Sequence, residues 1–293
     1  MVNSERNTPA DVWLARASWL ALPLLISPGM SSAIGSWDPP PRLTAEAAGW
    51  LVWAAGILAL FVRRPVALTA VRIASMWALV GSGLLVGYGS ITAVLAFLMA
   101  VVVLLGATRA DFAHFMINGA AFGNEDRHVL ATPPLVAFVV APLLVLGTGS
   151  ALLTATLGFA DRRWVLGGTL LGIATPLCVL TARSVHALAR RWLVLVPGGI
   201  TLHDPLALDQ PVLLPASAIR SVAVTNSDRQ GCVDLGLGAS FPATVISLDR
   251  PLELGRRGRQ PAGHGVDCVV VHPQRPGRFL QCAISRSASW ATD

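Results

Sequence analysis

The residues best suited to chemistry lie in one polar stretch, residues 109–134, between two long apolar runs. Asp111 and His114 are three positions apart, so on a helix they would share one face. Together with Glu125 or His128 they have the donor types of a divalent-metal site. The spacing fits no established metal signature, and we therefore assign no metal ligands.

Two other interpretations of this stretch stay open. Gly119 and Gly123 lie close to Arg127, and such a loop could hold a phosphate through its backbone N–H groups. The interpretation that we favour is a compact hairpin that docks on the C-terminal domain. In it, Glu125 or Asp126 pairs with Arg127, with Arg109 or with an arginine of the C-terminal domain, and this contact orders the loop. The candidate interaction or substrate residues are Asn118, Gly119, Gly123, Glu125, Asp126 and Arg127.

The four cysteines form no C-x-x-C pair, and the chain contains no G-x-S-x-G nucleophile motif. Cys178 lies in an apolar run, whereas the other three lie in the C-terminal third: Cys232, Cys268 and Cys282. A zinc site would require His264 or His272 to converge on these thiols. We expect buried, unpaired cysteines, and we assign no catalytic residue and no cofactor.

The composition places the chain in a membrane. Of its 293 residues, 54% are hydrophobic and only 13% are charged, whereas a globular domain has about 25% charged residues. The mean hydropathy is +0.62, and residues 73–108 include no charged side chain. These values exclude a soluble enzyme, a disordered chain and a secreted disulfide scaffold.

Six apolar runs are long enough to cross a bilayer as helices. We expect the first to remain in the protein as an uncleaved helix, because Asp11 precedes it and the region before it is not distinctly basic. The runs are residues 17–36, 47–62, 66–87, 91–107, 134–158 and 164–182.

Arginine placement predicts the orientation, since positive residues favour the cytoplasmic side. With a cytoplasmic N-terminus, the outer loops hold only Arg42, Arg162 and Arg163. The inner segments hold Arg6, Arg16, Arg63, Arg64, Arg109, Arg127, Arg183, Arg190 and Arg191. We therefore expect a multi-pass plasma-membrane protein with both termini in the cytoplasm.

After residue 182 the pattern changes to short β-type runs broken by Gly, Pro and Asp. The expected fold is an α-helical polytopic membrane domain of about six transmembrane helices (residues 1–182), a basic juxtamembrane helix (183–191) and a small β-rich cytoplasmic domain with a C-terminal helix (192–293). The expected strands are Trp192–Val196, 200–203, 212–214, 219–224, 232–235, 245–248 and Val266–Val271.

Positive charge in this tail suits a position near anionic lipid headgroups and is too diffuse for nucleic-acid binding. The candidate membrane-surface contacts are Arg183, Arg190, Arg191, Arg256, Arg257 and Arg259.

Residues 190–200, 212–215 and 219–222 resemble bacterial PH-like domains, which begin with a strand, a glycine turn, a second strand and then a P-x-x-x-I-x-x-V stretch. The loop at 118–127 and the later Pro-Pro also resemble uncharacterised actinobacterial multi-pass membrane proteins. This resemblance implies a PH-like tail and brings no established activity with it. Eukaryotic PH domains often bind phosphoinositides through a Lys/Arg cluster between the first strands, where this chain has His203 and Asp204.

The expected function is that of a non-enzymatic membrane scaffold or accessory subunit, which presents the PH-like domain for assembly with a membrane protein complex. Its expected partners are the lipid bilayer and other membrane proteins, and assembly into a homo- or hetero-oligomer stays open. The alternative is a membrane enzyme or transporter component that handles a lipid-linked or phosphorylated substrate at the inner face, through the loop residues named above.

Overall fold

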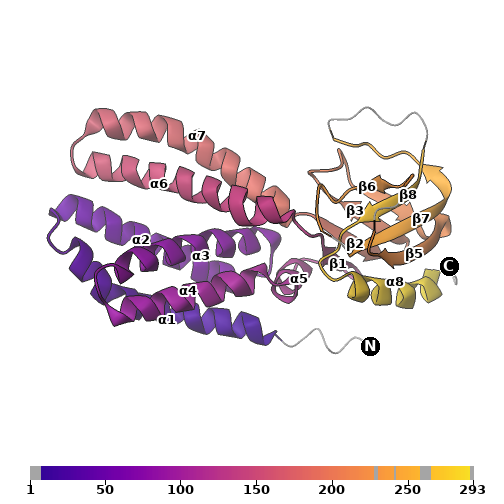
Figure 1. The fold of residues 1–293 in the computed structure, drawn as a ribbon, viewed down its shortest axis with the longest axis horizontal. Helices are drawn as coiled ribbons and strands as arrows, with labels where there is room; N and C mark the ends of the chain where they lie inside the picture. The colour runs from indigo at the N-terminus through magenta and orange to yellow at the C-terminus, as the bar shows by residue number, and fades with distance from the viewer. Residues whose placement is uncertain (1–7, 228–229, 241, 258–264, 291–293) are drawn as a thin grey trace. The chain divides into compact units, whose positions relative to one another are not determined.

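The computed structural model describes residues 8–227, 230–240, 242–257 and 265–290, with no account of the side chains of 287–290. The chain forms two compact units (Figure 1). The first consists of residues up to Met116 together with Val140–Val185, and the second of Ile117–Val139 together with the chain from His186 onward.

Among the described residues, six helices are long and apolar enough to cross a membrane, as the sequence predicts. Five are regular helices, and the remaining one begins with a π-helical turn, η2 (Val136–Val140), that continues into α6 (Ala141–Ala160). A shorter helix, α5 (Ala110–Asn118), follows the fourth span. The five regular helices are α1 (Ala10–Ile34), α2 (Pro39–Phe61), α3 (Pro65–Val86), α4 (Ile91–Thr108) and α7 (Trp164–Ala189).

Two tryptophans join α1 to α2. The indole N–H of Trp19 donates to the carbonyl of Trp53 at 2.8 Å, and the indole N–H of Trp53 donates to the carbonyl of Trp19 at 3.0 Å. The Trp19 ring lies against Gly56, where a Cβ would overlap it. A glycine is therefore required for this close approach of the two helices.

Arginines within the spans bond to the ends of neighbouring helices. The guanidinium of Arg16 is buried and donates to the carbonyl of Leu60 at 3.0 and 3.1 Å, in the last turn of α2. Arg72 donates to the carbonyl of Ala107 at 3.1 Å, in the last turn of α4. The last carbonyls of a helix have no partner within that helix, so these arginines satisfy groups that the helices leave open.

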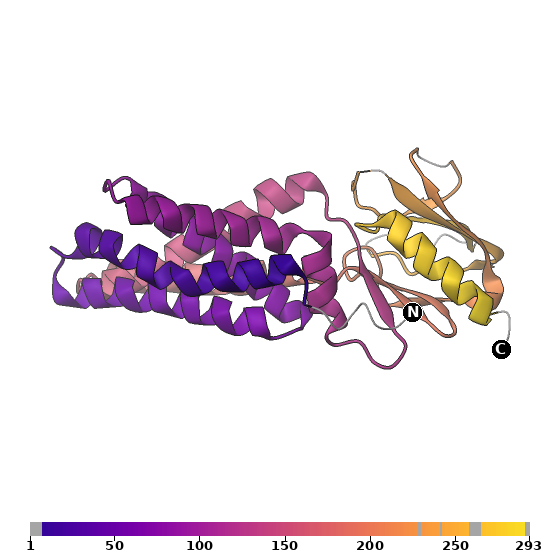
Figure 2. The ribbon, with the colours of Figure 1, turned by 90° about the horizontal axis from the view of Figure 1, so that it is seen from below.

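The second unit contains two four-stranded sheets and the final helix, α8 (Pro276–Trp290) (Figures 1 and 2). One sheet has the order β1-β2-β3-β4 and is antiparallel; the other has the order β5-β7-β8-β6, with β6 parallel to β8. A short 3-10 turn, η3 (Ala216–Ala218), joins β4 to β5. The strands are β1 (Asp126–Val129), β2 (Trp192–Val196), β3 (Gly199–His203), β4 (Val212–Pro215), β5 (Ile219–Thr225), β6 (Val233–Asp234), β7 (Ala243–Leu252) and β8 (Val266–Val271).

Apolar side chains from both sheets and from α8 form one core. Leu193 and Leu195 come from the first sheet, Ile246 and Val269 from the second, and Phe279 from α8; all five are fully buried. The predicted architecture of about six transmembrane helices followed by a small β-rich domain with a C-terminal helix is thus confirmed. All seven strands expected after residue 182 form, with bounds that differ by a few residues.

The predicted domain boundaries are wrong at one place, because the loop before the fifth span belongs to the second unit. Its β1 pairs with β2, from Asp126 opposite Leu195 to Val129 opposite Trp192. The same segment bonds to the other sheet, since the amide of Ala131 donates to the carbonyl of His272 at 2.6 Å. The loop is therefore an edge strand of the C-terminal domain and not a hairpin that docks on it.

The expectation of unpaired cysteines is wrong for two of the four. Cys232 and Cys268 form a disulfide. They directly precede Val233 and Val269, which face each other across the parallel pair β6–β8, so the strand pairing brings them together despite a separation of 36 residues. Cys178 and Cys282 are free thiols.

Candidate functional site

The strand β1 presents two polar side chains to the inside of the domain. Asp126 and His128 lie opposite Leu195 and Leu193, which belong to the core. Residues paired across a sheet share a face, so these two side chains point inward, whereas Arg127 between them points to the opposite face. There its guanidinium lies over the ring of Trp192, 5.6 Å from the centroid.

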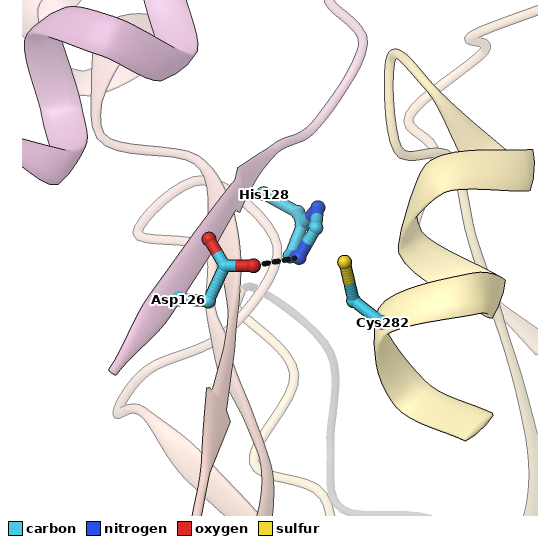
Figure 3. A group of neighbouring side chains, drawn as sticks. All are labelled: Asp126, His128 and Cys282. Atoms are coloured by element: carbon cyan, nitrogen blue, oxygen red, sulfur yellow. Dashed lines mark ion pairs between the residues drawn. The ribbon is translucent and has the colours of Figure 1, made fainter. Parts of the chain in front are cut away.

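The helix α8 brings a thiol to the same place. Phe279 and Ala283 are buried against the sheets, and Cys282 lies on the same side of the helix, half-buried. The ring of Phe279 packs edge-on against the imidazole of His128, with centroids 5.1 Å apart. Figure 3 shows the sulfur of Cys282 close to the side chains of Asp126 and His128.

The three side chains form a compact donor group. His128 Nε2 lies 3.0 Å from Asp126 Oδ2, and one donor atom from each of the three residues lies within 4.8 Å of the others. The side chain of His128 is only 5% exposed. Among the described residues, this is the group of three His, Cys, Asp or Glu side chains that could share a metal ion.

The surroundings hold Cys282 in its neutral form. Burial raises the pKa of its thiol, and the negative charge of Asp126 raises that pKa further. The positive charges of Arg278 and Arg286, one turn away on either side along α8, oppose these effects. A neutral thiol is a poor nucleophile, so the geometry does not favour covalent catalysis by Cys282.

One of the ion pairs predicted for the loop at residues 118–127 forms. Arg127 Nη2 lies 3.1 Å from Glu125 Oε2, which confirms the predicted pairing of an acidic loop residue with Arg127. The side-chain amide of Asn118 bonds twice to the backbone of Arg127, accepting from its N–H at 2.9 Å and donating to its carbonyl at 2.9 Å. Asn118 thus satisfies the same backbone groups of Arg127 that a neighbouring strand would. Residues Asp126–Val129 are ordered by their pairing with β2.

A phosphate cradle finds little support in this loop. The backbone does adopt a left-handed conformation at Gly123, where φ is 55°. However, such a cradle requires amide N–H groups that point to a ligand, and most of those near the turn donate within the protein. These are the amides of Ala120, Ala121, Phe122, Glu125 and Arg127.

Of the metal ligands weighed from the sequence, His128 and Cys282 belong to the donor group, and the others that the structure describes do not. Asp111 and His114 belong to the first unit, on α5, and are not part of the donor group. His272 contacts Asp234 at 3.2 Å and the carbonyl of Ser240 at 3.3 Å rather than a cysteine. His264 lies outside the described residues.

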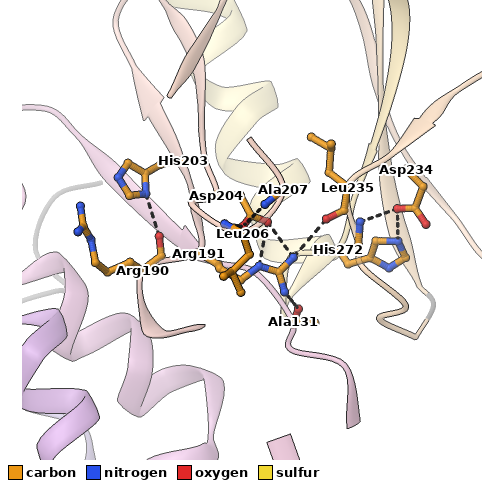
Figure 4. A network of polar contacts seen from close by, with 11 residues as sticks. Ala131, Arg190, Arg191, His203, Asp204, Leu206, Ala207, Asp234, Leu235 and His272 are labelled. Carbon is orange, nitrogen blue, oxygen red and sulfur yellow. Dashed lines mark hydrogen bonds and ion pairs between the residues drawn. The ribbon is translucent and has the colours of Figure 1, made fainter. Parts of the chain in front are cut away.

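Arg191 is not a membrane-surface contact, because its side chain is fully buried. Its guanidinium bonds to the carboxylate of Asp204 at 2.8 Å and donates to the carbonyls of Ala131 and Leu235 at 3.0 and 3.2 Å (Figure 4). The other oxygen of Asp204 accepts from the backbone amides of Leu206 and Ala207. Of the two adjacent arginines predicted to contact the membrane surface, Arg190 is exposed and Arg191 is buried.

The remaining candidate surface arginines differ in their surroundings. Arg183 is exposed on α7, and Arg256 is half-buried. Arg257 is exposed, yet its guanidinium donates to the carbonyl of Pro205 at 2.6 Å, which fixes its direction. Arg259 lies outside the described residues.

No protein-family model, curated protein or solved structure matches this chain. The site therefore has to be interpreted from its geometry. Sequence reasoning did not connect Cys282 with Asp126 and His128, which lie in a different part of the chain. One signal in the sequence could have indicated part of the site. Asp126 and His128 are two positions apart and precede the apolar Val129 and Leu130, so on a strand both side chains would lie on one face.

Proposed function

We propose that the chain is a non-enzymatic membrane scaffold or accessory subunit, in which the helices anchor a PH-like domain that docks on a membrane protein complex. The observation that carries this proposal is the pairing of β1 with β2. A strand from between the fourth and fifth spans forms an edge of the first sheet and contributes Leu130 to the core. The domain is thus a constituent of the membrane protein and not a detachable tail.

The arrangement of strands supports the PH-like assignment. The turn at Gly198 and Gly199 joins β2 to β3, and Gly199 has a φ of 141°, with the carbonyl of Leu214 where a Cβ would lie. The strands β4 and β5 follow, and α8 packs against β5 and β7. The resemblance rests on a strand, a glycine turn, a second strand and a P-x-x-x-I-x-x-V stretch, and the last of these forms the end of β4, η3 and the start of β5.

The internal pairing of the loop residues supports a non-enzymatic role. Glu125 bonds to Arg127, and Asn118 bonds to the backbone of that same residue. The alternative, a membrane enzyme or transporter component, would require these groups to face a polar cavity.

The docking surface that we favour is the outer edge of β5. This strand ends its sheet, so within the described residues its second edge pairs with no strand. Ala223 is exposed on it, and the side chain of Val224 is 38% exposed. An exposed strand edge offers N–H and C=O groups to which a partner can add a strand.

The cytoplasmic location of this surface rests on the arginine bias of the inner segments. In that orientation the docking partner is a membrane protein with a cytoplasmic part.

Site-specific photo-crosslinking in native membranes tests the proposal. A photoreactive side chain at Ala223 should give a discrete adduct with another membrane protein, and the Val224→Lys substitution should abolish it. The matched control is the same probe at Arg250, an exposed position on β7 away from the edge. Equal adducts at both positions, or an isolated monomer after mild detergent extraction, would contradict the proposal.

A further inference from the structure

The donor group of Asp126, His128 and Cys282 lies at the edge of the apolar core of the second unit. Both β1 residues face inward beside Leu193 and Leu195, and Phe279 packs on the imidazole. His128 is buried, whereas Asp126 and Cys282 are partly buried, and His128 already pairs with Asp126 at 3.0 Å. Desolvating such polar groups costs free energy, which contacts among them reduce. A bound cation would give all three a common partner.

We propose that Asp126, His128 and Cys282 bind one Zn²⁺ ion, which joins β1 to α8. The donor types select this class of metal, since thiolate and imidazole favour Zn²⁺ and its neighbours over Mg²⁺ or Ca²⁺. The thiolate and the carboxylate together carry the charge that balances a divalent ion.

The geometry requires only small movements. In a tetrahedral zinc site the metal lies about 2.0–2.3 Å from each donor, so the donor atoms are about 3.3–3.8 Å apart. His128 Nε2 and Asp126 Oδ2 are already 3.0 Å apart, and no pair of donor atoms in the group exceeds 4.8 Å. The three donor atoms therefore lie close to tetrahedral spacing before any metal binds.

The bound ion has a defined proton balance. Cys282 is held as a neutral thiol without metal, and binding forms the Zn–S bond while the thiol proton passes to solvent. The positive charges of Arg278 and Arg286 lie near Cys282 and reduce the affinity of the site for a cation. The guanidinium of Arg286 is held in place by a hydrogen bond to the carbonyl of Leu195 at 2.9 Å. Three protein donors leave the fourth position open to water or to a partner's side chain.

The structural consequence is a cross-link between distant parts of the chain. The strand β1 comes from between two spans and α8 is the last described helix, so one ion would tie the inserted strand to the end of the domain. Metal binding to the folded state raises stability by mass action, and chelation should lower the thermal midpoint of this domain.

Metal binding by the full chain in detergent, with a tag free of histidine and with disulfides reduced, tests the proposal. Co²⁺ added to EDTA-treated protein should give a thiolate-to-cobalt charge-transfer band with about one ion per chain, and Zn²⁺ should displace it. The Cys282→Ser variant should lose the band and bind Zn²⁺ at least about tenfold more weakly. The matched control, Cys178→Ser, changes the other free thiol and should keep both.

Three further variants test the proposed ligand set. Asp126→Asn and His128→Gln should each weaken Zn²⁺ binding at least about tenfold, and both should remove the increase in thermal midpoint that Zn²⁺ gives the unaltered chain. Cys232→Ser with Cys268→Ser should retain the cobalt band. The absence of the band in the unaltered chain, or its persistence in Cys282→Ser, would overturn the proposal, as would its loss in the Cys232 and Cys268 double variant.

Discussion

The guanidinium of Arg191 and the carboxylate of Asp204 form an ion pair with both side chains almost completely buried, at 1% and 2% exposure. Asp204 follows β3, and Arg191 directly precedes β2 and holds the carbonyls of Ala131 and Leu235. One pair therefore connects the segment after β1, the strands β2 and β3, and the segment after β6. Such a pair costs desolvation energy to bury, so its main consequence is that neither member can be removed alone.

We expect Asp204→Asn and Arg191→Met each to lower the free energy of unfolding of the C-terminal domain by about 3–5 kcal/mol, because each leaves a buried group without its partner. Urea-dependent proteolysis of the full chain in detergent measures this change. The matched control is Arg190→Met, because Arg190 is the exposed neighbour and a surface substitution usually changes stability by less than about 0.5 kcal/mol. Equal effects at the two arginines would contradict this role of the buried pair.

The same two arginines illustrate what the sequence could and could not predict. Spans and strands follow from local composition, and hydropathy alone located all six membrane helices. By contrast, Arg190 and Arg191 are adjacent and chemically identical, and only the position of Asp204 in the folded chain makes one of them buried. Burial of a charged side chain depends on a tertiary partner, which no local pattern contains.

The missed strand has a related cause. Three of the four residues of β1 are polar or charged, so its composition gives no strong strand signal. It forms because β2 offers it a partner more than sixty residues later, from Asp126 opposite Leu195 to Val129 opposite Trp192. The disulfide of Cys232 with Cys268 and the donor group at Cys282 likewise depend on pairings between distant segments.

The loop closure by Asn118 gives a second stability prediction. Its amide satisfies both the N–H and the carbonyl of Arg127, so Asn118→Ala should destabilise the second unit by about 1–3 kcal/mol and increase protease cleavage near β1. Asn124→Ala is the matched control, because Asn124 is exposed in the same loop. Unchanged cleavage in Asn118→Ala would show that strand pairing alone orders the loop.

A third prediction concerns the stability of the second unit at low pH, which depends on His203. The ring of His203 stacks on Trp192 with centroids 4.7 Å apart, and its Nδ1 lies 2.8 Å from the carbonyl of Arg190. Burial lowers the pKa of His203, with a further decrease from the positive charge of Arg190, although the bond to the carbonyl and the charge of Asp204 act in the opposite direction. The folded domain therefore binds fewer protons at this site than the unfolded chain.

It follows that the free energy of unfolding should fall as the pH is lowered through the ordinary histidine value of about 6.5. The His203→Gln variant should show a smaller decrease between pH 7 and pH 5, measured by urea-dependent proteolysis of the second unit. His114→Gln is the control, because His114 belongs to the first unit. A pH profile that is identical in His203→Gln and the unaltered chain would show that the fold does not depend on a neutral His203.

The last prediction concerns orientation, on which the proposed docking partner depends. In a chain whose native cysteines are replaced by serine, a cysteine at Pro40, in the first turn of α2, should react with an impermeant maleimide in intact cells. A cysteine at Gly255, in the exposed segment after β7, should react only after the membrane is opened. Both follow from the excess of arginine in the inner segments.

The disulfide makes this measurement more informative. A reducing cytoplasm keeps most thiols reduced, so the proposed orientation predicts that Cys232 and Cys268 are dithiols in growing cells and become bonded only after exposure to oxidant. Trapping free thiols with a maleimide polymer before lysis distinguishes the two states by gel mobility, with Cys178→Ser and Cys282→Ser removing the other thiols. A fully bonded pair together with rapid labelling at Gly255 would reverse the orientation and place the docking edge of β5 outside the cell.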